Sequence, residues 1–498
     1  IRYNVIRWVA SAQPAYGAIG PSFVNPRTGQ ILGSDISIEW ASGSFTPVLD
    51  DLFNGFNAPV KFPAENNNLL SDYATCSMGH ELKAEFISGM TAMEAADASP
   101  AELKEMHKQF LTYLVMHEMG HTLGLNHNMK SSQMLSPAEI NNKELTRKIG
   151  LYGSVMDYPA INVALDKSKQ GDFYTTKAGP YDLWAIEYGY TPFAEKEEAE
   201  SLKKILSRSN DPKLAFGNDG DDMRAPGKGM DPRVNIYDLS SDAIAYSEDR
   251  FNLINKLMGK LKDKYVKPGN SYAELRSRYG YLNNQRAQNT AVVSRYIGGV
   301  YIDRSYPEQS PAGKPYTPVP VATQKKAMAV LTKYVFAPNA YDADAPLFSY
   351  LQTQRRGFNQ NGTGDDFRIT GAVLNTQMGA IAHILNASTL QRITNSRLYG
   401  NQYSVADVMN DLVKGIFDAD IKSNVNVYRQ YLQSSFTEAL ASIMDPKTPG
   451  YDDVSKAACL YTLKKLKTQL SAAISTNEET KAHRANLLFL INNALENK

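Results

Sequence analysis

The stretch VMHEMGHTLGLNHNMK constrains the fold of this chain more than any other, because it holds three of the seven histidines among 498 residues. It contains the pattern H-E-x-x-H, formed by His117, Glu118 and His121. Residues four apart on a helix share a face, so two imidazoles can reach one ion while the glutamate lies about 100° around the axis. Gly124 adopts left-handed conformations easily and can turn the chain so that His127 returns as a third ligand. Three histidines with one open position are typical of a catalytic zinc site rather than a closed structural one.

A strong helix start lies upstream of this pattern. Ser99 can cap a helix, Pro100 suits its first turn, and Glu102 completes a capping box. The sequence therefore predicts a helix that runs from this cap to about Leu123 and stops at Gly124. The alternative is a helix whose histidines only cap it or line a core. That alternative suits a lone histidine, but five fixed positions in one pattern argue against it.

The rest of the first half alternates between regions that favour strands, loops and helices. The first forty residues are rich in β-branched and aromatic residues, as in RYNVIRWV, and we expect strands there. Residues 41–98 are mixed in composition, and we expect a long loop that carries short helices. A second Ser-Pro-Ala-Glu sequence at Ser136 predicts a shorter helix that ends before Gly150. The sequence AGPYDLWAIEYGY, residues 178–190, predicts another helix.

The second half of the chain has a different pattern. Residues 196–242 are charged and then rich in Gly, Asp and Pro, which indicates a connecting segment. Beyond it, apolar residues recur at helical spacing, as in MAVLTKYVF and VADVMNDLVKGIF. We therefore expect an α+β protein. A twisted mixed sheet and the long histidine-bearing helix would lie in residues 1–195, and a mainly α-helical domain would occupy residues 243–498.

The charge balance and the cysteines restrict the classes of partner. The chain has 53 lysines and arginines against 52 acidic residues, so no electrostatic argument favours a nucleic acid or an anionic membrane. No run of about 18 apolar residues occurs, so no membrane-spanning segment is expected. Cys76 and Cys459 lie too far apart for a disulfide framework, which suits a cytosolic protein as well as an exported bacterial one. The sequence does not predict the oligomeric state.

A second signature lies downstream of the histidines. The sequence YGSVMDYP places Met156 29 residues after His127, with Tyr158 two residues further on. Together with the histidine pattern, it resembles the metzincin zinc metallopeptidases, which have a methionine turn beneath the metal. The resemblance implies that Met156 forms a hydrophobic floor and is not a ligand. A tyrosine at this offset contacts zinc or stabilises the transition state in the astacin-like and serralysin-like branches, which implies that role for Tyr158. A tyrosine packed in the pocket wall is the alternative.

The flanking sequences extend this resemblance. GPYDLWAIEYG is similar to the helix that closes metzincin catalytic domains, and YGAIGPSFVNPRTGQILGSDISIEW resembles the last two strands before the active-site helix. The first of these strands would be the edge that pairs with a peptide substrate. The first strand and helix of a metzincin domain have no counterpart here. We therefore expect the chain to begin inside that domain, so the absence of a signal peptide says little about location.

The chain as a whole resembles a group of large bacterial zinc-dependent metalloproteases called met-zincins. The resemblance covers nearly the full length and is most specific from Arg7 to Tyr190. It implies that residues 1–195 form a metzincin-like catalytic domain. It also implies an exported enzyme that acts in the periplasm, in the cell envelope or outside the cell.

These features predict a zinc-dependent endopeptidase that acts on peptide or protein substrates. His117, His121 and His127 would hold zinc, which acidifies a water molecule and polarises the scissile carbonyl. Glu118 would take the proton of the water and pass it to the leaving amine, and Tyr158 would donate a hydrogen bond to the oxyanion. One alternative is a protein that binds zinc and peptide without turnover and uses its helical half as an interaction module. Another is a helical interaction protein with a vestigial N-terminal half.

Three further features carry weaker predictions. Cys76 and His80 could form a second metal site or an inhibitory thiolate, but a buried free thiol is the favoured interpretation. The sequence NDGDDM, residues 218–223, offers oxygen ligands for calcium but lacks the terminal glutamate of a full calcium loop. A solvated acidic loop at the edge of the cleft is the alternative there. His383 and His483 have no metal partners at ligand spacing.

Overall fold

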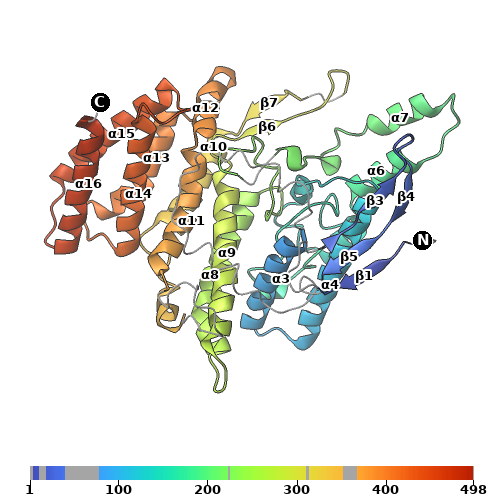
Figure 1. The fold of residues 1–498 in the computed structure, drawn as a ribbon, viewed down its shortest axis with the longest axis horizontal. Helices are drawn as coiled ribbons and strands as arrows, with labels where there is room; N and C mark the ends of the chain where they lie inside the picture. The colour runs from blue at the N-terminus through green and yellow to red at the C-terminus, as the bar shows by residue number, and fades with distance from the viewer. Residues whose placement is uncertain are drawn as a thin grey trace.

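The computed structural model describes residues 4–10, 18–39, 78–221, 225–309, 313–351 and 367–496. Over these residues the protein is mostly helical and has three small sheets. In Figure 1 the N-terminal strands lie on one side with α3 (Met78–Ala95) and α4 (Pro100–Thr122). The C-terminal helices lie on the other side, and α8 (Ala243–Tyr265) and α9 (Tyr272–Ser294) run between the two parts. None of the described helices is long and apolar enough to cross a bilayer.

Strands occupy much of the described part of the first forty residues, as the sequence predicts. The strands are β1 (Ile6–Val9), β2 (Ala18–Ile19), β3 (Ser22–Val24), β4 (Ile31–Ser34), β5 (Ile36–Glu39), β6 (Val300–Ile302) and β7 (Tyr316–Pro318). β5 is the central strand of a three-stranded sheet, with β1 parallel on one side and β2 antiparallel on the other. β3 and β4 form an antiparallel hairpin, as do β6 and β7. β2 is therefore an edge of the described sheet, and it contacts α4.

Helices make up most of the remaining described residues. Besides those named above, the α-helices are α5 (Lys143–Ile149), α6 (Pro180–Tyr190), α7 (Glu198–Leu206), α10 (Val321–Leu331), α11 (Ile369–Ile384), α12 (Ala387–Ser396), α13 (Val405–Phe417), α14 (Val427–Met444), α15 (Asp453–Ala472) and α16 (Glu478–Glu496). Short 3-10 or π segments are η2 (Ser131–Met134), η3 (Lys167–Lys169), η4 (Pro212–Leu214), η5 (Asp219–Asp221), η6 (Thr332–Phe336), η7 (Ala345–Tyr350), η8 (Arg397–Tyr399) and η9 (Asp418–Asp420). The helical character predicted for the second half is confirmed.

The boundaries of α4 agree with the sequence. The Ser99 side chain accepts from the Glu102 N–H, and the Glu102 carboxylate accepts from the Ser99 N–H at 2.7 Å. This reciprocal pair satisfies two amides that the first turn leaves without partners. The helix ends at Thr122, and Gly124 follows with φ +86°. That left-handed conformation is the one that favours glycine, so the predicted exit from the helix is confirmed.

The helix expected from Ser136 begins seven residues later, at Lys143. The Ser136 N–H and hydroxyl both donate to the Glu139 carboxylate, but the chain continues only in turns. The Asn142 side chain instead accepts from the Leu145 N–H and caps α5. The predicted start was wrong because the capping motif at Ser136 closes a turn and Asn142 supplies the N-cap, while the predicted end before Gly150 is confirmed. The helix predicted for residues 178–190 is confirmed as α6.

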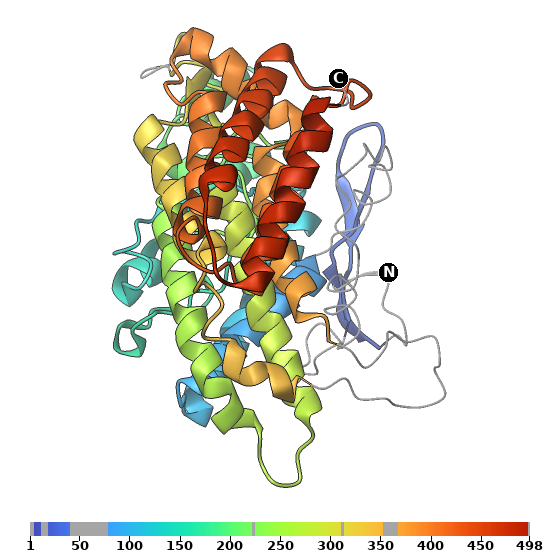
Figure 2. The same ribbon diagram turned by 90° about the vertical axis from the view of Figure 1, so that its left-hand side faces the viewer.

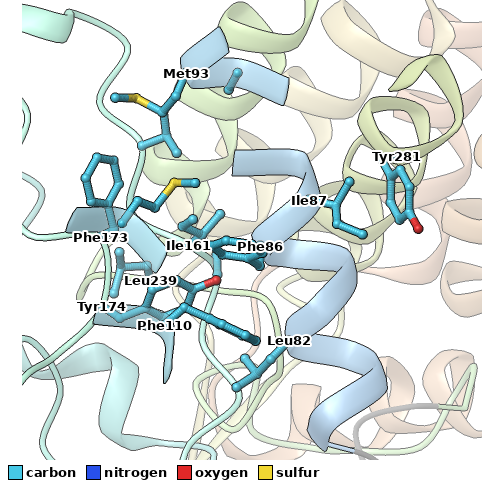
Figure 3. Packing of buried hydrophobic residues seen from close by; sticks show 14 of the residues in the cluster. Leu82, Phe86, Ile87, Met93, Phe110, Ile161, Phe173, Tyr174, Leu239 and Tyr281 are labelled. Carbon is cyan, nitrogen blue, oxygen red and sulfur yellow. The ribbon is translucent and has the colours of Figure 1, made fainter. Parts of the chain in front are cut away.

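Residues 78–95 form one long helix, α3, where the sequence favoured a loop with short helices. Its apolar residues recur at helical spacing, and Leu82, Phe86 and Met93 are buried. Figure 3 shows α3 between Phe110 of α4 and Tyr281 of α9, and the Phe86 and Phe110 rings stack at 4.5 Å. The prediction of a loop was wrong because packing against α4 stabilises α3, and the local sequence does not show that packing. Residues 40–77 lie outside the described residues.

Two large hydrophobic clusters and a small third one, around Tyr341, form the core of the described residues. The first extends from the strands through α3 and α4 to α8 and α9. The second contains residues of α8 to α16, and Figure 2 shows its last helices packed along one another. Val234, Ile236 and Leu239, from the segment expected to be a connector, are buried in the first cluster. The division at residues 195 and 242 stays a prediction, since α8 and α9 contribute to both clusters.

Candidate metal centre

Three histidines converge at the C-terminal end of α4. His117 and His121 lie four residues apart on the helix, and the turn at Gly124 returns His127 to them. The backbone closes this turn with a hydrogen bond from the Leu125 N–H to the Gly120 carbonyl at 3.0 Å. One ring nitrogen of each histidine lies within 4.8 Å of the other two. The structure thus brings together the three histidines that the sequence pattern singles out.

The partner of each Nδ1 atom fixes which ring nitrogen faces the centre. Nδ1 of His117 lies 2.8 Å from the Val155 carbonyl, and Nδ1 of His121 lies 3.0 Å from the Leu125 carbonyl. Nδ1 of His127 faces a carboxylate oxygen of Asp219 at 2.5 Å. All three partners are acceptors, so each Nδ1 carries the hydrogen and each Nε2 keeps its lone pair.

The spacing of two of these nitrogens suits a divalent cation. The Nε2 atoms of His121 and His127 lie 3.1 Å apart, close to the roughly 3.3 Å edge of a tetrahedron around zinc with Zn–N of about 2.0 Å. Nε2 of His117 is buried without a hydrogen-bond partner among the described residues. Burial and the neighbouring imidazoles lower the pKa of His117 well below its usual range and that of His121 to about 4. Neutral imidazoles are the form that binds metal.

Glu118 follows His117 on α4 and is fully buried. Its carboxylate oxygens are buried and have no hydrogen-bond partner among the described residues. Burial raises the pKa of Glu118 to about 8, because the charged form loses its hydration. Gly20, which follows β2, passes so close that a Cβ there would overlap the Glu118 carbonyl. The edge of the sheet therefore lies directly beside this carboxylate.

The turn predicted to carry Met156 lies beneath α4. A Cβ built on Gly120 would overlap the sulfur of Met156, so the glycine lets the methionine side chain approach the helix backbone. The Asn128 N–H donates to the Met156 carbonyl at 2.8 Å, which ties the turn to the residue after His127. Met156 is fully buried, as expected of a floor. Sequence reasoning did not assign a role to Gly120, although its place within H-E-x-x-H offered a signal.

Buried acids hold this turn in place, and the sequence did not reveal them. Asp182, at the start of α6, accepts from the Ser154 hydroxyl at 2.5 Å and from the Val155 N–H at 2.9 Å. Asp157 accepts from the Ser132 N–H at 2.7 Å. Burial raises the pKa of Asp182, and it raises that of Asp157 to about 7. These bonds fix the Val155 carbonyl that orients the first histidine.

Tyr158 reaches the metal centre from the same turn. Its hydroxyl lies 3.2 Å from Nε2 of His127, and its side chain is buried. Its carbonyl accepts from the Tyr237 N–H at 2.8 Å, so the region after residue 196 supports it. Because Nε2 of the histidine is an acceptor, the hydroxyl can donate to it. The hydroxyl therefore lies where it can reach a group bound at the centre.

The acidic loop that the sequence suggests as a calcium site, residues 218–223, borders the three histidines. Asp219 faces His127, and Asp221 accepts from Arg304 at 2.6 Å. These carboxylates have protein partners, and a calcium site stays a prediction. Residues 222 and 223 lie outside the described residues, as do Cys76 and the side chain of His80.

A helix-borne H-E-x-x-H pair with a third histidine after a glycine turn forms a group of three histidines that could bind a metal ion. The sequence model of the Met-zincin family matches residues 99–424, which is more than half of the chain. The chain therefore belongs to the Met-zincin family, and the resemblance found in the sequence is confirmed. No curated protein and no solved structure matches the chain.

Proposed function

We propose that the protein is a zinc-dependent peptidase that hydrolyses peptide bonds at the three-histidine centre. One observation carries this proposal. Three imidazole lone pairs converge at the end of the helix that also carries Glu118, whose carboxylate is buried without a described hydrogen-bond partner. A metal site that only stabilises a fold has no need for such a group. Membership of the Met-zincin family supports the same activity.

The residues of the centre have distinct roles. His117, His121 and His127 would hold zinc, which supplies a Lewis acid that polarises a carbonyl and acidifies a water molecule. Glu118 would accept the proton of the attacking water and later donate it to the leaving amine. Tyr158 donates a hydrogen bond to the oxygen of the tetrahedral intermediate.

The substrate would bind along β2. This strand is an edge of the described sheet and leads to Gly20, which touches the backbone at Glu118. An extended peptide that adds to this edge by main-chain hydrogen bonds would run past the carboxylate. Extended peptide or protein segments are therefore the proposed substrates. Location in the bacterial cell envelope stays a prediction of the family resemblance alone.

The alternative is a protein that binds zinc and peptide without turnover. Its helical half, built on the second hydrophobic cluster, would then act as an interaction module. Glu118 argues against this alternative, because a buried carboxylate without a described hydrogen-bond partner costs stability, and such groups concentrate at functional sites.

The test compares the wild type with Glu118→Gln, and Glu144→Gln on exposed α5 serves as a matched control. We expect about one zinc per chain in all three proteins when they are purified without chelator. Cleavage of casein or a quenched peptide library should fall about 100- to 10,000-fold in Glu118→Gln and stay unchanged in the control. Equal cleavage by the wild type and Glu118→Gln would favour the binding protein. A wild type without zinc would contradict the proposal.

A further inference from the structure

The third histidine differs from the other two in the group that orients it. His117 and His121 place Nδ1 against backbone carbonyls, whereas His127 places it against the carboxylate of Asp219, 92 residues further along the chain. We propose that Asp219 is a positioning residue of the metal centre, which fixes the orientation and tautomer of His127 and strengthens its bond to zinc. This inference rests on the metal-binding part of the proposed function.

The contact has the chemistry that this role requires. Nδ1 of His127 lies 2.5 Å from Oδ2 of Asp219, within reach of a hydrogen bond from the imidazole to the carboxylate. A carboxylate accepts the Nδ1 hydrogen more strongly than a carbonyl does and raises the electron density at Nε2. The imidazole thus becomes a better donor to a cation. Both side chains are largely buried, with 13% and 29% of their surfaces exposed, so solvent screens the contact only partly.

The loop that carries Asp219 is attached to the residues that follow the histidine. The side-chain nitrogen of Asn128 donates to the Ala215 carbonyl at 3.0 Å, and its side-chain oxygen accepts from the Gly217 N–H at 3.2 Å. The Met129 N–H donates to the Gly217 carbonyl at 2.7 Å. The loop and the turn after His127 therefore form one hydrogen-bonded unit. These bonds hold the Asp219 carboxylate in a fixed position relative to His127.

A second anchor holds the other side of the loop. Asp221 accepts from the Asn218 N–H at 3.2 Å and from a guanidinium nitrogen of Arg304 at 2.6 Å. Arg304 lies two residues after β6, whose partner strand β7 leads into α10. Metal binding is thereby linked to a part of the chain that lies far beyond the H-E-x-x-H helix. The segment between residues 196 and 242 completes the metal centre in addition to joining two parts of the fold.

The test measures zinc affinity, not peptide cleavage. Wild type, Asp219→Asn, Asp219→Ala and the control Asp211→Asn are stripped of metal and titrated with zinc against a chromophoric chelator. Asp211 is exposed and caps η4, and it makes no described contact with the centre. We expect affinity to fall about 10- to 100-fold in Asp219→Ala. The loss should be smaller in Asp219→Asn, which keeps an acceptor oxygen, and absent in Asp211→Asn.

A second readout separates positioning from a general loss of structure. Thermal unfolding of the metal-free proteins should give the same midpoint for Asp219→Asn as for the wild type. Cobalt substituted for zinc should show an altered visible spectrum in both Asp219 variants, because the spectrum reports the ligand arrangement. If Asp219→Ala does not fold, Asp219→Asn decides alone, and its weaker zinc binding supports the inference.

The outcomes distinguish this inference from the proposed function. Zinc affinity equal to that of the wild type in the folded Asp219 variants would overturn the positioning role and leave the peptidase proposal intact. A wild type that binds no zinc would overturn the metal centre and this inference together.

Discussion

Two buried histidines, one on α4 and one on α11, show what separates a candidate metal ligand from a core residue. His117 and His383 are both almost fully buried, and in both Nε2 has no hydrogen-bond partner among the described residues. Burial lowers the pKa of both imidazoles well below the usual range. By these measures the two side chains are equivalent.

Their tautomers and neighbours differ. Nδ1 of His117 donates to a carbonyl, which leaves a lone pair on Nε2. Nδ1 of His383 accepts from the Gly227 N–H at 3.1 Å, so Nε2 carries the hydrogen and cannot bind a cation. Other imidazoles surround the first ring, whereas Arg295 and Arg392 add positive charge near the second. Burial and a lowered pKa therefore do not identify a ligand, but convergent lone pairs do.

The largest expected effect is the loss of zinc when the first of these histidines is replaced. His117→Ala should weaken zinc binding by more than the 10- to 100-fold expected for an outer partner, because it removes a ligand atom. His383→Ala should destabilise the helical half through a buried cavity and leave zinc affinity unchanged. Metal analysis and chelator competition on folded protein measure both. Equal zinc affinity in His117→Ala and the wild type would show that His117 is not a zinc ligand.

Two tyrosines extend the comparison from binding to catalysis. Tyr158 directs its hydroxyl to the metal centre, and Tyr403 donates its hydroxyl to Asp411 at 2.8 Å in the second cluster. Tyr158→Phe should lower kcat about 100- to 1,000-fold with little change in KM, since the hydrogen bond forms mainly in the transition state. Tyr403→Phe should leave kcat unchanged. A kcat in Tyr158→Phe that matches the wild type would assign that tyrosine to the wall of the site.

Two helical glycines test whether the close contact between α4 and the Met156 turn requires a residue without a side chain. A Cβ on Gly120 would overlap Met156, while a Cβ on Gly379 in α11 would meet no described atom within 4 Å. Gly120→Ala should destabilise the protein by about 1–3 kcal/mol through overpacking. Gly379→Ala should stabilise it by about 0.5–1 kcal/mol, because alanine loses less backbone entropy in a helix. Denaturant unfolding measures both, and a neutral Gly120→Ala would mean that the turn can move away from α4.

The local part of the metal centre could be predicted from the sequence, and the long-range part could not. His117, His121 and His127 lie within eleven residues, so the period of the helix and one glycine determine their meeting. Asp182 and Asp219 act from 27 and 92 residues away from their partners, and only the folded chain brings them there. The acidic composition around Asp219 is visible in the sequence, but no local pattern indicates that this carboxylate faces His127.

The same division applies to the fold. The cap at Ser99 predicted α4 because both halves of its capping box lie within four residues. The similar sequence at Ser136 failed because the chain there forms turns until Asn142. α3 was overlooked because its neighbouring residues are mixed in composition and its stability comes from packing against α4 and α9. Helices with strong amphipathic patterns in the second half, such as α13, were predicted correctly.

The last prediction concerns the stability of the helical half in acid. Burial lowers the pKa of His483 to about 4, and the neutral ring packs with Nε2 2.9 Å from the Gln433 side-chain oxygen. The unfolded chain binds a proton at about pH 6.5, so between pH 6.5 and 4 it holds more protons than the folded chain. The free energy of unfolding should therefore fall as the pH drops through this window. Because solvent screens part of the electrostatic cost, we expect this histidine to contribute about 1–2 kcal/mol. His483→Gln keeps a hydrogen-bonding group and cannot ionise, so its unfolding free energy should depend less on pH by that amount.

Denaturant unfolding of both proteins at pH 7 and pH 4.5, followed by the circular dichroism of the helices, measures this difference in pH dependence. The same pH dependence in both proteins would show that the ring is protonated as easily in the folded helical half as in the unfolded chain.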